Sequence, residues 1–299
     1  MSNKDMLLAL CIVTIWGVNF VIIAWGLEGM PPLLLGGIRF LMVASIGSLF
    51  FKRPAIPIKW WVAYAIPISF LQFAFLFSAM AFGMPAGLAS LALQAQALFT
   101  LLFAFLILKE AIKGYQIVAI AVAVMGLSII AFSNNTETMT ALGFGLTMAS
   151  AASWALGNIC NRTISNRGYK ANVNLIIWSA WVPPIPFFLS SWYFEGSDLI
   201  ISSLVNFSWQ SLASLVYLSI CATIVGYGLW SYLLSRYPAA QIAPLSLGVP
   251  IVGITSASIL LSESISQMQW IGASLVLTGL LMNTFGGRLK RRVPDAKSL

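Results

Sequence analysis

The sequence contains no histidine. That absence excludes histidine metal sites, Ser-His and Cys-His catalytic arrangements, and imidazole proton relays. Cysteine is also scarce. Cys11, Cys160 and Cys221 lie far apart inside apolar runs, which is typical of small buried residues rather than of disulfides or metal ligands. We therefore expect neither a metal centre nor a cofactor.

Catalytic motifs are missing too. The chain has no H-E-x-x-H motif, no G-x-S-x-G motif and no paired aspartates within an apolar run. These absences argue against an intramembrane enzyme, so we assign no catalytic residues. A membrane sensor or receptor would need a signalling domain or a docking surface, and the short loops offer little for either.

Charged residues make up only 8% of the chain, against about 25% in a typical soluble domain. Hydrophobic residues make up 60%, and the mean hydropathy is +0.92. A soluble protein of this length could not hide so much apolar surface, so the surrounding solvent must be a lipid bilayer. The net charge of +8 does not indicate a nucleic-acid partner, because the basic residues lie in short loops and at the C-terminus.

Ten apolar runs are each long enough for a membrane helix, which needs roughly 20 residues. The loops between them are short, so we expect no soluble domain. The predicted fold class is an all-α membrane protein with ten transmembrane helices. The predicted spans are 6–26, 33–51, 60–82, 86–108, 115–132, 141–161, 172–194, 211–234, 239–261 and 267–286.

Loop charge orients these helices. With the N-terminus in the cytoplasm, every one of the 16 Lys and Arg residues except Arg39 falls on the cytoplasmic side. This pattern predicts that both termini are cytoplasmic. We interpret the first apolar run as a retained helix, since no small-residue cleavage site follows it. The outer loops hold only acidic charges, at Glu28, Glu137, Glu195, Asp198 and Glu263.

Two stretches of the chain match without a gap. Residues 85–130 align with residues 238–283 at an offset of 153 (238 − 85), so that Gly126 matches Gly279. An offset of about half the chain indicates a duplicated fold rather than a solenoid. The predicted units are a first five-helix repeat at 1–133, a second at 134–287 and a basic cytoplasmic tail at 288–299.

Each half contains an odd number of helices, so the second half enters the membrane from the opposite side. Glu110 is then cytoplasmic and its counterpart Glu263 external. Inverted repeats are typical of secondary transporters, whose halves exchange roles to open either side. No Asp or Glu lies in a predicted transmembrane core, which favours facilitated movement or exchange over carboxylate-mediated proton coupling. Coupling through Glu110 or Glu263, both at helix ends, stays open.

Arg39 lies inside the second predicted span. An intramembrane arginine is costly and needs a partner or water. One interpretation is a counter-ion for an anionic group such as a substrate carboxylate. The other is a side chain that extends to the outer interface, toward Glu28.

Two predicted helices each carry a face that combines tryptophan with asparagine. An asparagine facing lipid would leave its amide unpaired, so these faces are expected to point inward. They suit a central cavity for a small amphipathic solute, although hydrogen bonds between helices would explain either asparagine alone. The two sets are Trp16, Asn19 and Phe20, and Trp154, Asn158 and Asn161.

Glutamines and aromatic residues add further candidates. Gln72, Gln94 and Gln96 are uncharged donors and acceptors in the third and fourth spans, where they either line a cavity or bond neighbouring helices. Gln94 and Gln96 are about 200° apart around an α-helix, so we do not expect one cavity to take both. Tyr227 is the most central of the aromatic candidates, which are Trp178, Tyr227, Trp230 and Tyr232.

Several stretches together carry a resemblance to a known family. They are WGVNFVI (16–22), PPLLLGGIRF (31–40), residues 68–100, ATIVGYGLW (222–230) and residues 243–263. On these stretches the chain resembles the EamA family of the drug/metabolite transporter superfamily over nearly its whole length. The resemblance implies a multi-pass exporter of the bacterial inner membrane, acting on cysteine-pathway metabolites of the O-acetylserine/cysteine class or on similar amino-acid-like solutes.

The resemblance also implies a basket-shaped cavity formed by helices 1, 3, 4, 6, 8 and 9, with helices 5 and 10 outside it. Arg39 matches the family's Arg-Phe pair but lies on helix 2, which the basket does not explain. The positions that the basket makes candidates for substrate binding are Trp16, Asn19, Gln72, Gln94, Trp154, Asn158 and Tyr227.

We therefore predict a secondary transporter, an exporter of small zwitterionic metabolites that works by alternating access between the halves. The expected partners are a small-molecule substrate and the lipid bilayer, and both a monomer and a homodimer are compatible with the sequence. Arg39 is expected to attract the carboxylate, Trp16 and Trp154 to form apolar walls, and Asn19 and Asn158 to orient polar groups. The alternative within the class is a broader drug or aromatic-amino-acid exporter.

Overall fold

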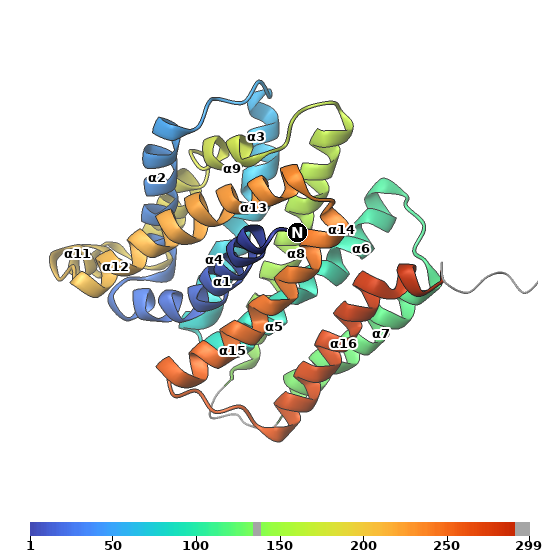
Figure 1. Ribbon diagram of the computed structural model, residues 1–299. Coiled ribbons are helices and arrows are strands. Elements are labelled where there is room, and N and C mark those ends of the chain that lie inside the picture. The colour runs from blue at the N-terminus through green and yellow to red at the C-terminus, as the bar shows by residue number, and fades with distance from the viewer. Residues whose placement is uncertain (134–138, 291–299) are drawn as a thin grey trace, which may run out of the picture.

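The computed structural model describes residues 1–133 and 139–290 of the chain. All regular secondary structure in this described part is helical (Figure 1). The prediction of an all-α fold is therefore confirmed. The helices pack into one bundle in which α1 (Asn3–Gly29) contacts helices of both halves of the chain.

The first half follows the predicted order of spans, with two of them interrupted. Its helices after α1 are α2 (Pro32–Phe50); α3 (Ile58–Ala65), the π-helical η1 (Ile66–Leu71) and α4 (Gln72–Ala81); α5 (Ala86–Ala92), the 3₁₀ turn η2 (Leu93–Ala95) and α6 (Gln96–Leu108); and α7 (Gly114–Phe132).

The second half contains one helix that the sequence analysis placed in a loop, α11 (Ser197–Val205), which contacts α10 and lies at the edge of the bundle (Figure 1). The other helices of this half are α8 (Ala141–Asn166); α9 (Val173–Ser179) and α10 (Pro184–Phe194); α12 (Trp209–Val216), the π-helical η3 (Tyr217–Val225) and α13 (Gly226–Arg236); α14 (Ala239–Ile242), the 3₁₀ turn η4 (Ala243–Leu247) and α15 (Gly248–Leu260); and α16 (Gln267–Lys290).

Within the described residues, 8 helical spans are long and apolar enough to cross a membrane, and up to 9 if the bent pair α9 and α10 forms one span. The bend of 42° in that pair follows from Pro183 and Pro184, which interrupt the helical hydrogen bonds. The predicted span 141–161 is present as α8, a helix of 26 residues that is not among the 8. Its sequence is less apolar because it buries polar side chains against other helices, among them Thr147, Ser150 and Ser153.

The helix ends follow local chemistry. The hydroxyl of Ser2 accepts a hydrogen bond from the Asp5 N–H at the start of α1, and Thr140 caps α8 by accepting from the Gly143 N–H. Pro32 stands at the first position of α2, where a missing N–H is harmless. These caps set where the bundle turns back on itself.

The irregular segments recur at the offset of the sequence repeat. Adding 153 to residues 66–71 of η1 gives 219–224, which lie within η3, and adding it to 93–95 of η2 gives 246–248, which overlap η4. Lys109 and Ser262 are also 153 apart, and each follows the end of a helix, α6 or α15, in the left-handed conformation with φ of 56°. The two halves of the chain therefore break their helices at equivalent positions, some of them outside the matched stretches.

Helices α7 and α16 lie side by side at the edge of the bundle (Figure 1). A Cβ atom at Gly126 would lie 2.6 Å from the carbonyl oxygen of Gly272, and one at Gly279 would lie 2.7 Å from that of Ala119. Because Gly126 matches Gly279 and Ala119 matches Gly272, the same close contact occurs twice with exchanged partners. Only glycine permits this backbone approach.

The two ends of the bundle differ in charge. At one end Arg162 pairs with Glu110 at 2.8 Å, and Arg167 lies over the Trp60 ring at 4.8 Å. We call this the basic end. At the other end, which we call the acidic end, Glu28 accepts a hydrogen bond from Gln210. There the carboxylate of Glu195 accepts a backbone N–H at the start of α2, and that of Glu263 accepts one at the start of α5.

Candidate functional site

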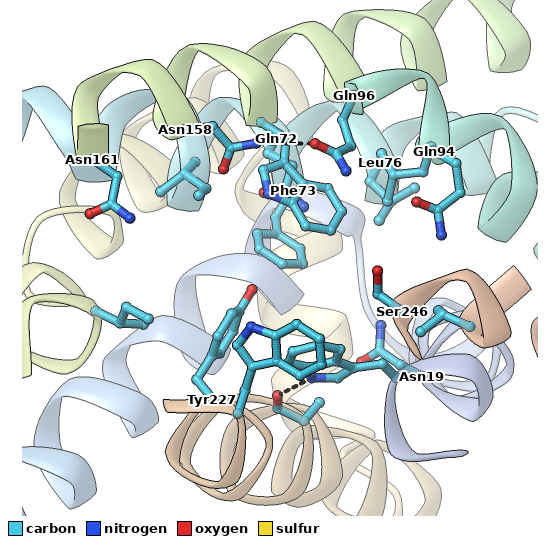
Figure 2. Close-up of a pocket in the computed structure, with 18 of the residues that line it drawn as sticks. Asn19, Gln72, Phe73, Leu76, Gln94, Gln96, Asn158, Asn161, Tyr227 and Ser246 are labelled. Carbon is cyan, nitrogen blue, oxygen red and sulfur yellow. Dashed lines mark hydrogen bonds between the residues drawn. The ribbon is translucent and has the colours of Figure 1, made fainter. Parts of the chain in front are cut away.

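A cavity of about 470 Å³ lies between the helices of the two halves. Its volume falls in the range of about 300–1,000 Å³ that is usual for small-molecule sites. Side chains from α1, α4, α8 and α13 project into it (Figure 2). The structure brings together all of the predicted site residues on its lining: Trp16, Asn19, Arg39, Gln72, Gln94, Trp154, Asn158 and Tyr227.

The cavity extends toward the basic end of the bundle. Its lining reaches Asn161, Asn172 and Leu234, which lie close in sequence to Arg162, Arg167 and Arg236. None of the acidic-end carboxylates Glu28, Glu195 and Glu263 lines it. No described residue of α7 or α16 lines it either, as expected for helices outside a basket.

Arg39 is buried in the protein, with 2% of its surface exposed. Its Nη2 donates to the hydroxyl of Thr223 at 3.1 Å, and its guanidinium carbon lies 4.1 Å from the centre of the Phe73 ring. The side chain does not extend to the outer interface, and Glu28 instead accepts from Gln210 at 2.7 Å. The interpretation of Arg39 as an interfacial residue is therefore wrong.

The Arg39 guanidinium also lacks an anionic partner. Its Nε and Nη1 atoms are buried without a hydrogen bond, and the ion pair found among the described residues joins Arg162 to Glu110 instead. No Asp or Glu of the described lining faces the cavity. A buried cation with free N–H donors is suited to receive a carboxylate or another anion.

Trp16 forms part of an aromatic wall. Its Nε1 donates to the backbone carbonyl of Ala222 at 3.0 Å. Ala222 lies in η3, where the π-helical hydrogen bonds of the backbone differ from those of a regular α-helix. The Trp16 ring lies 5.3 Å from those of both Tyr227 and Trp230. The hydrogen bond fixes the indole orientation, so the ring presents an apolar surface to the cavity.

Amide side chains face this wall across the cavity (Figure 2). Asn158 of α8 donates to Gln96 Oε1 at 3.0 Å and to Thr100 Oγ1 at 3.1 Å, both on α6. Asn158 thus bonds two helices and lines the cavity at once. Gln94 and Gln96 both line the cavity, so the expectation that one cavity would exclude one of them is wrong. The 3₁₀ turn η2 interrupts the helix at this point, and the ideal α-helical angle does not apply.

Gln72 and Asn19 offer free acceptors. They are 3% and 9% exposed, and Gln72 Oε1 and Asn19 Oδ1 are buried without a hydrogen bond. Gln72 is held by its backbone, since its carbonyl accepts from the Ser150 hydroxyl of α8 at 2.7 Å. Buried polar atoms are normally paired, so these two oxygens are available to accept hydrogen bonds from a ligand.

The sequence analysis missed several lining residues and named two that lie elsewhere. Trp178 donates to the Phe51 carbonyl at 2.8 Å, and the Tyr232 ring lies against Arg236 at 4.6 Å; neither lines the cavity. The missed polar residues carried no signal beyond being polar residues in or beside an apolar run; they are Tyr64, Ser90, Asn172, Ser231 and Ser246.

The lining as a whole is neutral apart from Arg39, with amides and aromatic rings around one guanidinium. Among the described residues, no group of three or more Cys, Asp or Glu side chains could hold a metal ion. The arrangement can bind a small molecule that combines a carboxylate, hydrogen-bond donors and an apolar part.

Comparisons with known proteins identify the family of this chain. The family model described as "EamA-like transporter family" matches residues 3–132 and 141–285. The chain is 49% identical over 295 residues to a "Probable amino-acid metabolite efflux pump" of Escherichia coli (strain K12), covering 98% of this chain and 99% of that protein. It is 48% identical to the protein of the same name from Salmonella typhimurium, covering 97% and 98% of the two chains.

A solved crystal structure with 17% sequence identity shares the fold, with a TM-score of 0.65 over 97% of this chain and 99% of the other. The family match extends over nearly the whole chain, in two stretches separated by residues 133–140. The chain therefore belongs to the EamA-like transporter family, and it is a multi-pass membrane transporter rather than an enzyme.

Proposed function

We propose that this protein exports small zwitterionic amino-acid metabolites of the O-acetylserine/cysteine class. The observation that carries the proposal is Arg39, a buried guanidinium with two unpaired nitrogens on the wall of an otherwise neutral cavity. Two relatives, at 49% and 48% identity, bear the name "Probable amino-acid metabolite efflux pump", which supports export of amino-acid metabolites in general.

The free groups of the cavity are complementary to an α-amino acid. The substrate carboxylate pairs with Arg39, and the ammonium donates to the free oxygens of Asn19 and Gln72. The side chain of the substrate then lies against the rings of Trp16 and Tyr227. Binding is specific because each charged group of the ligand meets a buried protein group that otherwise has no partner.

The proposed mechanism is alternating access by two inverted five-helix repeats, 1–133 and 134–287, with ten membrane spans and both termini in the cytoplasm of a bacterial inner membrane. Three observations support it. Basic and acidic residues gather at opposite ends of the bundle, helix breaks recur at the repeat offset, and the contact between α7 and α16 occurs twice with exchanged partners.

The two matched glutamates indicate which end is closed. Glu263 of the second repeat accepts the N–H groups of Ala86 and Gly87 of the first, at 2.7 and 2.9 Å. Its counterpart Glu110 pairs instead with Arg162. In the proposed cycle, the Glu263 contact closes the acidic, external end while the cavity extends toward the basic, cytoplasmic end. Opening outward releases Glu263 and lets Glu110 take up the equivalent contact at the start of α14.

The deciding experiment is counterflow of labelled cysteine and O-acetylserine in proteoliposomes, with and without an imposed pH gradient. Counterflow that does not depend on the gradient supports an exchanger or facilitator. Transport that requires the gradient indicates proton coupling and directs attention to Glu110 and Glu263. If neither solute moves, the substrate assignment fails while the transporter family stands.

A second candidate is a broader exporter of drugs or aromatic amino acids. The aromatic wall of Trp16, Tyr227 and Trp230 favours it, since planar apolar solutes stack on such rings. The same proteoliposomes distinguish the two: uptake of aromatic amino acids or dyes without cysteine counterflow selects this candidate.

A further inference from the structure

We propose that the substrate-free cavity binds a monovalent inorganic anion at Arg39, and that substrate displaces it. Arg39 is the charged side chain among the described residues that line the cavity. The displacement by substrate rests on the proposed function. Anion binding itself does not, because it depends on Arg39 alone.

The protein provides no internal counter-ion for this guanidinium. Its nearest hydrogen-bond partner is the neutral Thr223 hydroxyl, whose own proton is already donated to the carbonyl of Leu218 at 2.8 Å. Tyr64 and Tyr227, which also line the cavity, are neutral. A buried charge without a paired partner is strongly unfavourable, so a mobile anion is needed whenever no carboxylate is bound.

The surroundings select the kind of anion. The guanidinium carbon lies 4.1, 5.4 and 5.8 Å from the ring centres of Phe73, Phe40 and Phe77. These rings exclude water on one side, so an anion must lose part of its hydration to reach the free Nε and Nη1 donors. The free energy cost of dehydration is lower for bromide than for chloride and higher for fluoride. We therefore expect bromide to bind most tightly of the three.

Arg162, at the basic end of the bundle, is not an alternative anion site. Arg162 is half exposed and already paired with Glu110 at 2.8 Å. It therefore supplies a matched control: the R162Q variant removes an arginine of the same protein but leaves the cavity guanidinium intact.

The test uses the full chain in detergent, free of amino acids. Thermal unfolding is followed while sodium gluconate is replaced by sodium chloride or bromide at constant ionic strength. For the wild-type protein and R162Q we expect a saturable rise of about 2–4 °C in Tm, with bromide acting at lower concentration than chloride. For R39Q we expect the saturable rise to disappear, and for R39K its midpoint to move upward by about tenfold.

Equal halide effects in the wild-type protein and R39Q would mean a general salt effect and would overturn the proposal. Should R39Q fail to fold, the ³⁵Cl NMR linewidth of chloride decides instead: the wild-type protein must broaden it and R39K must broaden it less. Cysteine should reverse the broadening. If the anion binds but cysteine does not displace it, the anion site is supported and the proposed substrate is refuted. If cysteine shows counterflow but no anion binds, the proposed substrate is supported and the anion site is refuted.

Discussion

Arg39 is the residue on which the proposed binding of substrate and anion depends. It is buried, it touches aromatic rings, and two of its nitrogens have no partner. A buried charge of this kind destabilises a fold unless a ligand compensates it. Arg39 therefore lowers the stability of the ligand-free fold and strengthens ligand binding, and both effects can be measured.

Replacing Arg39 by methionine should separate the two properties. Counterflow should fall by about 100-fold, because losing one partner of a buried charged contact costs about 2–5 kcal/mol. The protein itself should unfold at the same or a higher temperature, since an apolar residue replaces an uncompensated charge. Counterflow and thermal unfolding of the same preparation check both expectations, and wild-type transport by correctly inserted R39M would refute the role.

At the scale of elements, the contact between α7 and α16 depends on backbone proximity. Gly126 and Gly279 leave no room for a side chain against Gly272 and Ala119. No described residue of either helix lines the cavity, so we expect this contact to stabilise the bundle rather than to bind substrate.

The G126V variant should therefore lose about 1–3 kcal/mol of stability, as overpacked contacts do. Gly145 of α8 is the matched control, because a Cβ there meets nothing within 4 Å. The G145A variant should keep or slightly increase stability, since alanine is a better helix former by about 0.5–1 kcal/mol. Denaturation in detergent compares the two, and equal Tm values for both variants would contradict the close contact.

The paired glutamates also act between elements. Glu263 joins α5 to the second half by two charge-assisted hydrogen bonds. The ion pair of Arg162 and Glu110 has side chains 53% and 38% exposed, respectively, and contributes little. We expect E263Q to favour the outward-open state and E110Q the inward-open state.

The measurement uses an N161C variant without the native cysteines, since Asn161 lines the cavity near the basic end. Labelling from the cytoplasmic side should fall in E263Q by about tenfold, because one lost charge-assisted hydrogen bond corresponds to about 1.5–3 kcal/mol. Labelling should stay the same or rise in E110Q. A change of the same sign in both variants would contradict an exchange of roles.

At the scale of the whole molecule, charge sets the orientation. Arg162 and Arg167 lie at one end, and Glu195 and Glu263 at the other. From this distribution of charge, the positive-inside rule predicts that the basic end faces the cytoplasm.

Topology reporters test this orientation. Green fluorescent protein fused to the C-terminus should fluoresce, and alkaline phosphatase fused there should be inactive, because the proposed topology places the C-terminus in the cytoplasm. Alkaline phosphatase inserted after Gly196, between α10 and α11, should be active. The reverse result at either position would overturn the ten-span topology.

The sequence by itself determined the fold class, the approximate helix bounds, the two matched stretches and the lining residues such as Arg39, Gln72 and Tyr227. These follow from local properties: apolar length, loop charge and the rarity of polar groups inside lipid. Polar residues in membrane helices must face protein, and in a bundle with one cavity many of them face that cavity.

Only the tertiary structure decided how those residues are paired. It left Arg39 without a counter-ion, brought Gln96 beside Asn158, turned Trp178 away toward Phe51 and set Glu263 against α5. Each of these contacts joins residues far apart in the sequence, across helices whose π and 3₁₀ turns shift the register of their faces. Sequence periodicity assumes regular helices, so it cannot specify pairings that depend on where the helices are irregular.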